Sequence, residues 1–144
     1  PSHTWAHTYL TNMSEGQILQ SLNQTRDAIV AAGGNAPKGV RPPGGKINDA
    51  SKAVLAKAGM PSIVWSVDTL DWKTRNAQKT IDTVLSQVKD GDIVLMHDLY
   101  EQSAIAAETL IPELTKRGYQ LVTVSEMAEL RGGMAAGHSY GHFR

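Results

Sequence analysis

Two histidines stand four residues apart near the start of the sequence, at His3 and His7. On a helical turn this spacing places both imidazole rings on one face, as a metal site requires. A catalytic zinc ion normally takes three protein ligands and keeps one position for water, so the pair needs a further ligand such as a carboxylate. A pair of surface histidines gives the same pattern, and the spacing alone leaves both interpretations open.

A third histidine, His97, directly follows the apolar run 93–96. If this run is a buried strand, His97 lies at its C-terminal edge, a good position for proton transfer and equally for a hydrogen-bonded structural histidine. Asp71 lies in the loop after the preceding predicted strand, and a carboxylate paired with an imidazole fixes its tautomer and stabilises its protonated form. Arg41, which precedes two prolines, is either a rigidly held partner for a carboxylate or a surface arginine before a turn.

Helices and strands must position these side chains, and the pattern predicts that the two alternate. Ser14 and Gln17 form a capping-box pattern at the start of the first helix, and Gly33 stops it. Such alternation favours right-handed βαβ units in a parallel sheet or barrel, where the loops after the strands carry the site. The further predicted helices are 50–58, 77–88, 103–117 and 125–130 (capped by Ser125), and the predicted strands are 40–41, 61–67, 93–96 and 121–124.

Composition limits the function classes. The 144 residues fit one domain, and 41% hydrophobic with 19% charged residues is ordinary for a globular protein. Formal net charge is zero, so the sequence carries no electrostatic footprint for nucleic acid. Cysteine is absent, which excludes disulfides and thiolate ligands. No apolar run approaches the roughly 20 residues of a membrane span, and no signal peptide is visible.

Four short motifs together resemble one known family. Residues 3–7 (HTWAH) match its H-[ST]-x-x-H metal motif, and residues 41–45 (RPPGG) match R-P-P-Y-G, with Gly44 in place of tyrosine. Residues 68–72 (DTLDW) match D-x-x-D-W, and residues 93–97 end in its L-x-H pattern. In this order they resemble the polysaccharide deacetylase family (NodB homology domain, carbohydrate esterase family 4), and within it the peptidoglycan N-acetylglucosamine deacetylases. The resemblance covers about residues 2–130, and residues 131–144 are predicted to be a tail.

The resemblance implies a distorted (β/α) barrel and metal-dependent hydrolysis of acetyl groups on a polysaccharide. The expected substrate is N-acetylglucosamine in peptidoglycan, with chitooligosaccharides and acetylated xylan as alternatives. A divalent ion is implied, zinc first, with cobalt, nickel or manganese as alternatives, and His3 and His7 would be two of its ligands. His97 would be the general acid and Asp71 its partner, while Arg41 would orient a base aspartate. A bacterial extracellular or cell-surface location is expected.

Three further residues receive roles from the same resemblance. Leu95 and Trp72 would line the pocket for the acetyl methyl group. The backbone N–H at Gly44 would help to bind the oxyanion. Because Gly44 replaces a tyrosine, one wall of the substrate groove would be missing at that point.

The family's T-F-D-D-G motif supplies the base aspartate and a third metal ligand, and no Asp-Asp pair occurs in this sequence. We therefore expect the C-terminal part of a NodB barrel, without its first strand and helix. A companion segment carrying Asp-Asp, or oligomerisation, would then cover the strand edges and apolar faces left exposed. The first alternative is a truncated, non-catalytic remnant that binds metal or glycan. The second is an unrelated hydrolase with Asp98 or Asp68 as third ligand, although Asp98 would point away from His97 on a strand.

His138 and His142 repeat the four-residue histidine spacing near the end of the sequence. Glycines at 137 and 141 disfavour a stable helix there. The segment is predicted to be a flexible tail, with an extra metal site or a tail that returns to the groove as alternatives.

Overall fold

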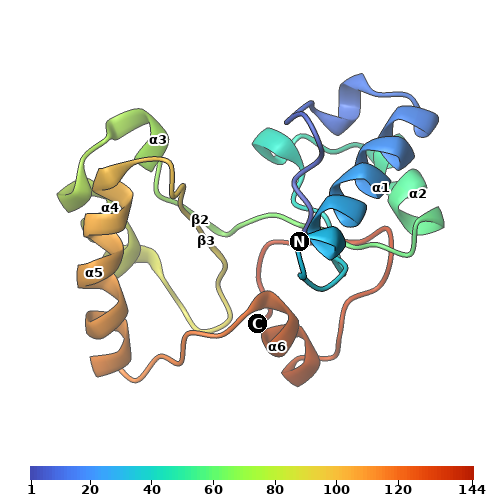
Figure 1. Ribbon diagram of the computed structural model, residues 1–144. Helices are drawn as coiled ribbons and strands as arrows, with labels where there is room; N and C mark the ends of the chain where they lie inside the picture. Colours follow the sequence, from blue (N-terminus) through green and yellow to red (C-terminus); the bar gives the residue numbers. More distant parts are fainter. The chain divides into compact units, whose positions relative to one another are not determined.

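The computed structural model describes residues 1–144, which divide into two compact units. Unit 1 consists of residues 1–64 and 134–140, and unit 2 of residues 65–133 and 141–144. Both are α/β, with the helices labelled in Figure 1. No helix has both the length and the apolar character that crossing a membrane requires.

Unit 1 contains two α-helices, α1 (Glu15–Ala31) and α2 (Asp49–Lys57), and the short 3-10 turns η1 (Leu10–Asn12) and η2 (Pro43–Gly45). The predicted capping box is confirmed at the start of α1, where the Gln17 N–H donates to Ser14 Oγ and the Ser14 N–H donates to Gln17 Oε1. The Asn48 side chain caps α2 by accepting from the Ser51 N–H.

The sheet of unit 1 is small and parallel. β1 (Ser62–Ile63) pairs with β4 (Ser139–Tyr140), and isolated parallel bridges join Ser2 to Val40 and Val40 to Ser62. Val40 is fully buried and packs in the core beneath α1 and α2. The residues of that core are Leu10, Ile18, Leu22, Val40, Val54 and Leu55.

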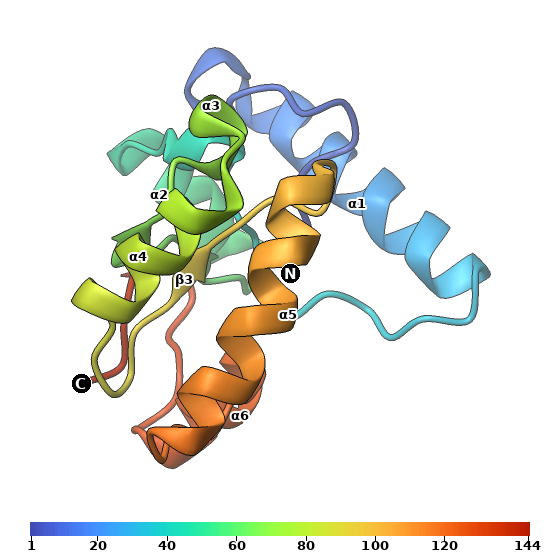
Figure 2. The same ribbon diagram turned by 90° about the vertical axis from the view of Figure 1, so that its left-hand side faces the viewer.

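Unit 2 places helices around a second parallel pair, β2 (Val67–Asp68) and β3 (Val94–Leu95). Its helices are α3 (Asp71–Thr74), α4 (Ala77–Gln87), α5 (Glu101–Lys116) and α6 (Val124–Leu130). α4 and α5 lie side by side, as Figures 1 and 2 both show, and share the core of this unit. That core comprises Ile81, Val84, Ala106, Leu110 and Leu114. The prediction of alternating helices and parallel strands is confirmed.

Two predicted strands differ from the structure. The run 61–67 is not one strand, because residues 64–66 separate β1 from β2 and the two strands pair with different partners. The strand predicted at 121–124 does not form, and α6 begins there instead, with Thr123 rather than Ser125 as its N-cap. Thr123 is the N-cap because its side chain and that of Glu126 complete a capping box. The predicted strand lacks support because Leu121 is half exposed and pairs with no other strand.

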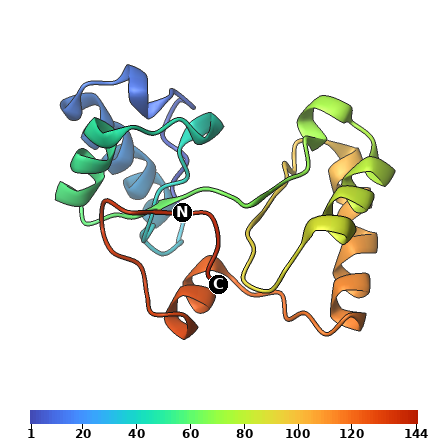
Figure 3. The same cartoon turned by 180° about the vertical axis from the view of Figure 1, so that it is seen from behind.

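The last residues are not a free tail. β4 adds a parallel strand to β1, with the Ser62 N–H donating to His138 O at 2.8 Å (Figure 3). Phe143 is buried, and its N–H donates to Gly91 O at 2.8 Å. The prediction of a flexible tail at His138–His142 is therefore wrong, because strand hydrogen bonds hold residues 138–140 in unit 1, and the buried Phe143 is held in unit 2.

Candidate active site

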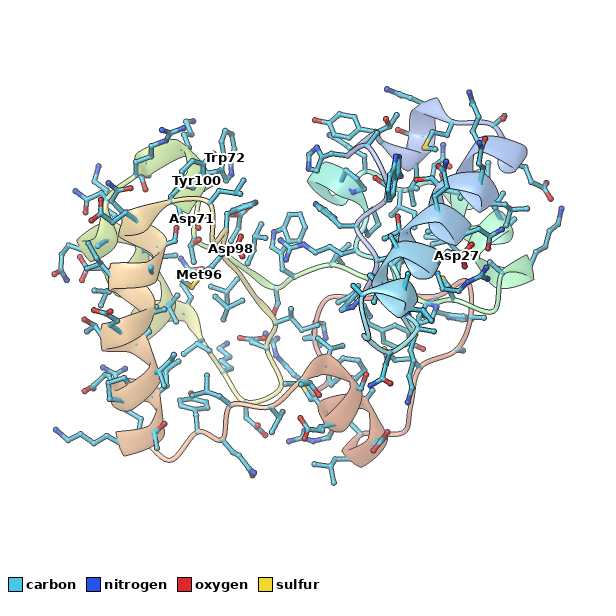
Figure 4. The ribbon with its side chains drawn as sticks, in the orientation of Figure 1. Asp27, Asp71, Trp72, Met96, Asp98 and Tyr100 are labelled. Carbon is cyan, nitrogen blue, oxygen red and sulfur yellow. The ribbon has the colours of Figure 1, made fainter.

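Asp71 and His97 form a hydrogen-bonded pair in unit 2. His97 Nδ1 lies 2.8 Å from Asp71 Oδ1, and Asp71 is only 2% exposed while His97 is 33% exposed. His97 follows β3, and Asp71 is the first residue of α3. Figure 4 shows Asp71 beside Trp72, Met96, Asp98 and Tyr100 at this end of the unit. Strand and helix thus bring together residues 26 positions apart.

Four donors converge on the Asp71 carboxylate. Oδ2 accepts from the Ser103 hydroxyl and from the His97 backbone N–H, both at 2.6 Å. Oδ1 accepts from His97 Nδ1 at 2.8 Å and from the Trp72 N–H at 2.9 Å. Burial by itself disfavours the charged carboxylate, but the hydrogen bonds from Ser103, His97 and Trp72 outweigh it and hold the pKa of Asp71 below its usual value. Asp71 is therefore an anion at neutral pH.

The ionised Asp71 determines which proton His97 can move. Because Oδ1 only accepts, His97 Nδ1 must carry the hydrogen of the 2.8 Å bond. In the neutral ring the lone pair is then on Nε2, and in the charged ring Nε2 carries the transferable proton. This arrangement suits a general acid or base that acts through Nε2.

The backbone around Asp71 is held in an unusual conformation. Leu70 precedes α3 with φ +51°, and Arg75 follows it with φ +46°. Thr69 supports the turn: its hydroxyl donates to Leu95 O at 2.7 Å and accepts from the Asp71 N–H at 3.3 Å. The Arg75 guanidinium lies 4.3 Å from the centre of the Tyr100 ring, so the end of α3 is tied to the start of α5.

The histidine pair of unit 1 lies on an irregular turn. His3 to His7 is not helical, contrary to the expectation from the spacing, because Thr4 and His7 have φ of +65° and +55°. The two imidazole rings still meet edge to face, with centroids 4.9 Å apart. His3 Nδ1 lies 2.6 Å from Arg41 O, and because a carbonyl accepts only from a protonated nitrogen, the lone pair of the neutral His3 ring is on Nε2.

All four non-glycine residues with positive φ lie in these two turns. They are Thr4 and His7 in the histidine turn, and Leu70 and Arg75 around Asp71. Each such residue costs about 1–3 kcal/mol, and such strain is concentrated at functional sites. The positive φ values thus lie in or next to two of the four sequence motifs, residues 3–7 and 68–72.

The residues of the histidine turn fit a metal ion in part. Two imidazoles converge, and the buried Thr4 hydroxyl beside them has no hydrogen-bond partner. No group of three His, Cys, Asp or Glu side chains that could hold a metal is present in residues 1–144. His3 and His7 therefore suit two ligand positions of a metal site.

Comparison with known proteins points to one family. The family model described as polysaccharide deacetylase matches residues 1–63. The chain is 42% identical over 130 residues to the peptidoglycan-N-acetylmuramic acid deacetylase PdaC of Bacillus subtilis, a match that covers 90% of this chain and 27% of that protein. It is 40% identical over 126 residues to the peptidoglycan-N-acetylglucosamine deacetylase PgdA of Listeria monocytogenes, covering 88% of this chain and 26% of that protein. The chain spans about a quarter of the length of these relatives.

A solved structure described as T48 deacetylase with substrate matches with a TM-score of 0.88 and 35% identity, over 96% of this chain and 68% of that chain. The chain belongs to the polysaccharide deacetylase family. Its α/β fold is that of the NodB homology domain of carbohydrate esterase family 4, as the resemblance of the four motifs predicts.

Two other solved structures show the range of this family. An acetyl xylan esterase from Clostridium thermocellum, in complex with cobalt, matches at TM-score 0.87 and 27% identity over 97% of this chain and 69% of that chain. A family 4 pseudoenzyme from Bacillus anthracis matches at TM-score 0.79 and 28% identity over 87% of this chain and 44% of that chain. Membership of the polysaccharide deacetylase family thus includes a metal-bound esterase and a protein without activity.

The predicted site residues of this family fall into two groups. His3, His7, Arg41 and Gly44 belong to unit 1, and Asp71, Trp72, Leu95 and His97 belong to unit 2. The structure brings Asp71 to His97 and the two histidine rings together, while the roles of these four residues in acid catalysis and metal binding stay predictions. Leu95 is buried, Trp72 is 47% exposed, and the roles of Arg41, Gly44, Leu95 and Trp72 toward a substrate stay predictions.

Ser103 and Thr69 were not found by the sequence reasoning. Ser103 is buried on α5, 32 residues from the Asp71 that it bonds, and no local pattern links two such distant positions. Thr69 did carry a signal, because a threonine two residues before an aspartate favours a hydroxyl bond to the backbone N–H.

Proposed function

We propose that this chain forms part of a polysaccharide deacetylase that hydrolyses acetyl groups on peptidoglycan amino sugars. The observation that carries the proposal is the buried, ionised Asp71 that holds His97 through Nδ1 and leaves Nε2 for the reaction. The two relatives with the highest identities reported above are peptidoglycan deacetylases, which supports the substrate class.

In the proposed mechanism His97 is the general acid. Water adds to the acetyl carbonyl, and the C–N bond breaks as the protonated His97 Nε2 gives its proton to the leaving nitrogen, so that acetate and a free amine result. Asp71 stabilises the charged imidazole and keeps Nδ1 turned away from the substrate. Trp72 and Leu95 would contact the acetyl methyl group, and the Gly44 N–H would donate to the oxyanion.

A divalent metal would be held by His3 and His7 together with a carboxylate, and would supply a Lewis acid that polarises the acetyl carbonyl. Zinc is the first choice, with cobalt, nickel and manganese as alternatives. His3 suits this role because its Nδ1 is taken up by Arg41 O at 2.6 Å, as outer carbonyls commonly orient metal-binding histidines.

The carboxylates that the mechanism still requires are absent from this sequence, which has no adjacent aspartates. We propose that a segment carrying Asp-Asp supplies both the third metal ligand and the base, and that Arg41 orients that base. Denaturing mass spectrometry of the active protein, with sequencing of every polypeptide in it, tests this proposal. Full activity from a protein without such a segment would contradict it.

N-acetylglucosamine is the proposed target sugar. PgdA is named for this sugar and PdaC for N-acetylmuramic acid, so assays should include both, along with chitooligosaccharides and acetylated xylan. A bacterial cell-surface or extracellular location would place the protein at this substrate, and the bacterial relatives support that location.

A second candidate function is binding of metal or glycan without turnover. The pseudoenzyme among the family structures supports this second candidate. Substrate binding without acetate release, by protein that contains an Asp-Asp segment and bound metal, would select this function.

His97→Ala is the test of the leading proposal. In the whole protein, this variant should lower the rate of acetate release from peptidoglycan by about a hundredfold or more, because the general acid is lost. Metal content should stay near that of the parent, since His97 is not a proposed ligand. An unchanged rate would remove His97 from the mechanism.

A further inference from the structure

The ring of Tyr9 lies against Gly44. A Cβ atom added at Gly44 would lie 3.1 Å from Tyr9 Cε1, 3.4 Å from Cζ and 3.5 Å from the hydroxyl oxygen. A side chain at position 44 would therefore point into the space that the outer edge of the Tyr9 ring occupies. Gly44 also has φ +58°, a conformation that glycine adopts without strain.

Both partners of this contact are firmly held. Tyr9 precedes η1, its carbonyl accepts from the Asn12 N–H at 3.0 Å, and the next residue, Leu10, is 1% exposed. Gly44 follows the buried Pro42 and Pro43 in η2. Tyr9 is nevertheless 41% exposed, so part of its ring is open to solvent while one edge packs on Gly44.

The Tyr9–Gly44 contact lies next to the proposed metal-binding turn. Tyr9 is two residues after His7, and Gly44 is three residues after Arg41. The bond from His3 Nδ1 to Arg41 O joins the same two segments, 3–9 and 41–45. The two contacts thus hold one exposed aromatic ring in the segment that directly follows the histidine pair.

We propose that Tyr9 is a sugar-binding residue that packs its exposed ring face against a pyranose of the acetylated polysaccharide. The C–H face of a pyranose is apolar and can pack against the flat face of an aromatic ring. Tyr9 would thereby provide an aromatic wall from a different segment, at the position where Gly44 itself has no side chain. This inference rests on the proposed function for the identity of the sugar.

Two substitutions at Tyr9 separate ring stacking from simple filling of space. Tyr9→Phe keeps the flat ring, whereas Tyr9→Leu keeps an apolar side chain against Gly44 without a flat face. Using the whole protein, we expect Tyr9→Leu to raise KM by roughly two- to tenfold with kcat nearly unchanged, the size of an aromatic contact. Tyr9→Phe should stay within about twofold of the parent, as the matched control. Thermal midpoints and metal content check that both variants keep the fold and the histidine turn.

A binding measurement separates this inference from the proposed function. Calorimetry with tetra-N-acetylchitotetraose should show weaker binding by Tyr9→Leu than by the parent and by Tyr9→Phe. If the parent binds this probe but releases no acetate from peptidoglycan, the proposed function fails, while a loss of binding confined to Tyr9→Leu still supports the inference. Equal binding by parent and Tyr9→Leu, an equal loss in both variants, or no binding by the parent would overturn it.

Discussion

At the scale of single residues, the buried carboxylate of Asp71 is held by four hydrogen bonds. Each of its oxygens accepts two hydrogen bonds, and removing any donor leaves a buried, charged acceptor partly unsatisfied. Such a loss costs about 1–3 kcal/mol. Ser103 is the side-chain donor that can be altered without removing the proposed general acid His97.

Ser103→Ala should therefore act through Asp71 and His97. Without the hydroxyl at 2.6 Å, the pKa of Asp71 rises toward its usual value, so the Asp71–His97 ion pair is lost at a higher pH than in the parent. We expect the acidic limb of the pH–rate profile to move upward in pH and kcat to fall by roughly tenfold. A pH–rate profile of acetate release measures both effects.

Two variants make this test specific. Ser103→Thr keeps a hydroxyl and should restore the profile. Ser51→Ala removes another buried serine, which bonds to Asn48 and not to the site, and should lower stability without moving the profile. If Ser103→Ala only lowers stability in the same way, Ser103 has no positioning role.

His3 can be tested separately from His97. His3→Ala removes one of the two converging imidazoles, so zinc affinity should fall by about tenfold or more, whereas the rest of the fold is retained. Elemental analysis after dialysis against graded zinc measures the occupancy. His138→Ala is the matched control, because it removes a histidine of the second four-residue pair. Equal occupancy in His3→Ala and parent would disprove the ligand assignment.

At the scale of elements, the glycine in the turn 90–92 is required by a segment about fifty residues later in the chain. Gly91 has φ +83°, and a Cβ there would come within 2.2 Å of Phe143 O. The backbone near residue 143 can approach only because residue 91 has no side chain. The carboxylate of the next residue, Asp92, bonds to Arg144 and to the Ser66 hydroxyl, which adds to the same attachment.

Gly91→Ala should be strongly destabilising, and Gly118→Ala supplies its control. Gly118 has a similar φ of +89° but no atom within 4 Å of an added Cβ. We expect about 1 kcal/mol for Gly118→Ala from backbone strain alone, and at least about 2 kcal/mol more for Gly91→Ala because the backbone of residue 143 must move. Urea unfolding of both variants measures the difference. Equal losses would mean that residues 141–144 do not pack as described.

At the scale of the whole molecule, the chain has two separate cores, one in each unit. The two buried carboxylates whose ionisation stabilises the fold both lie in unit 2. Asp71 and Asp92, both in unit 2, are buried carboxylates whose pKa is lowered. For Asp92, burial opposes ionisation, but hydrogen bonds from Arg144, Lys89 and Ser66 outweigh it. Both groups stabilise the folded state only while they are ionised.

Acid should therefore destabilise the protein through these two residues. Since their folded pKa lies below the unfolded value of 3.8, the stabilisation is complete well above pH 3.8 and is lost as pH falls through the lower folded values. Urea midpoints measured from pH 6 to about pH 3 should fall less steeply in Asp92→Asn than in the parent. The control is Asp27→Asn, at an exposed position on α1 (Figure 4). Parallel curves for parent and Asp92→Asn would contradict this assignment.

Much of this protein was determined by the sequence alone. The capping box at Ser14, the helices, the parallel pairing and the Asp71–His97 contact could all be predicted. Caps depend on residues three positions apart, and apolar runs depend on burial of a whole strand or helix. Both signals are local. The four motifs indicated the polysaccharide deacetylase family.

Only the tertiary structure decided the rest. The division of 61–67 into two strands, the bond from Ser103 to Asp71 and the strand at Ser139 each depend on partners 27 to 77 residues away. The non-helical histidine turn depends on how the loop at Arg41 accepts from His3. Tyr9 lies against Gly44 because one position lacks a side chain and the other is held by a buried neighbour. Such long-range choices are made by packing, since a residue's own neighbours in sequence do not determine which distant group will fill the space beside it.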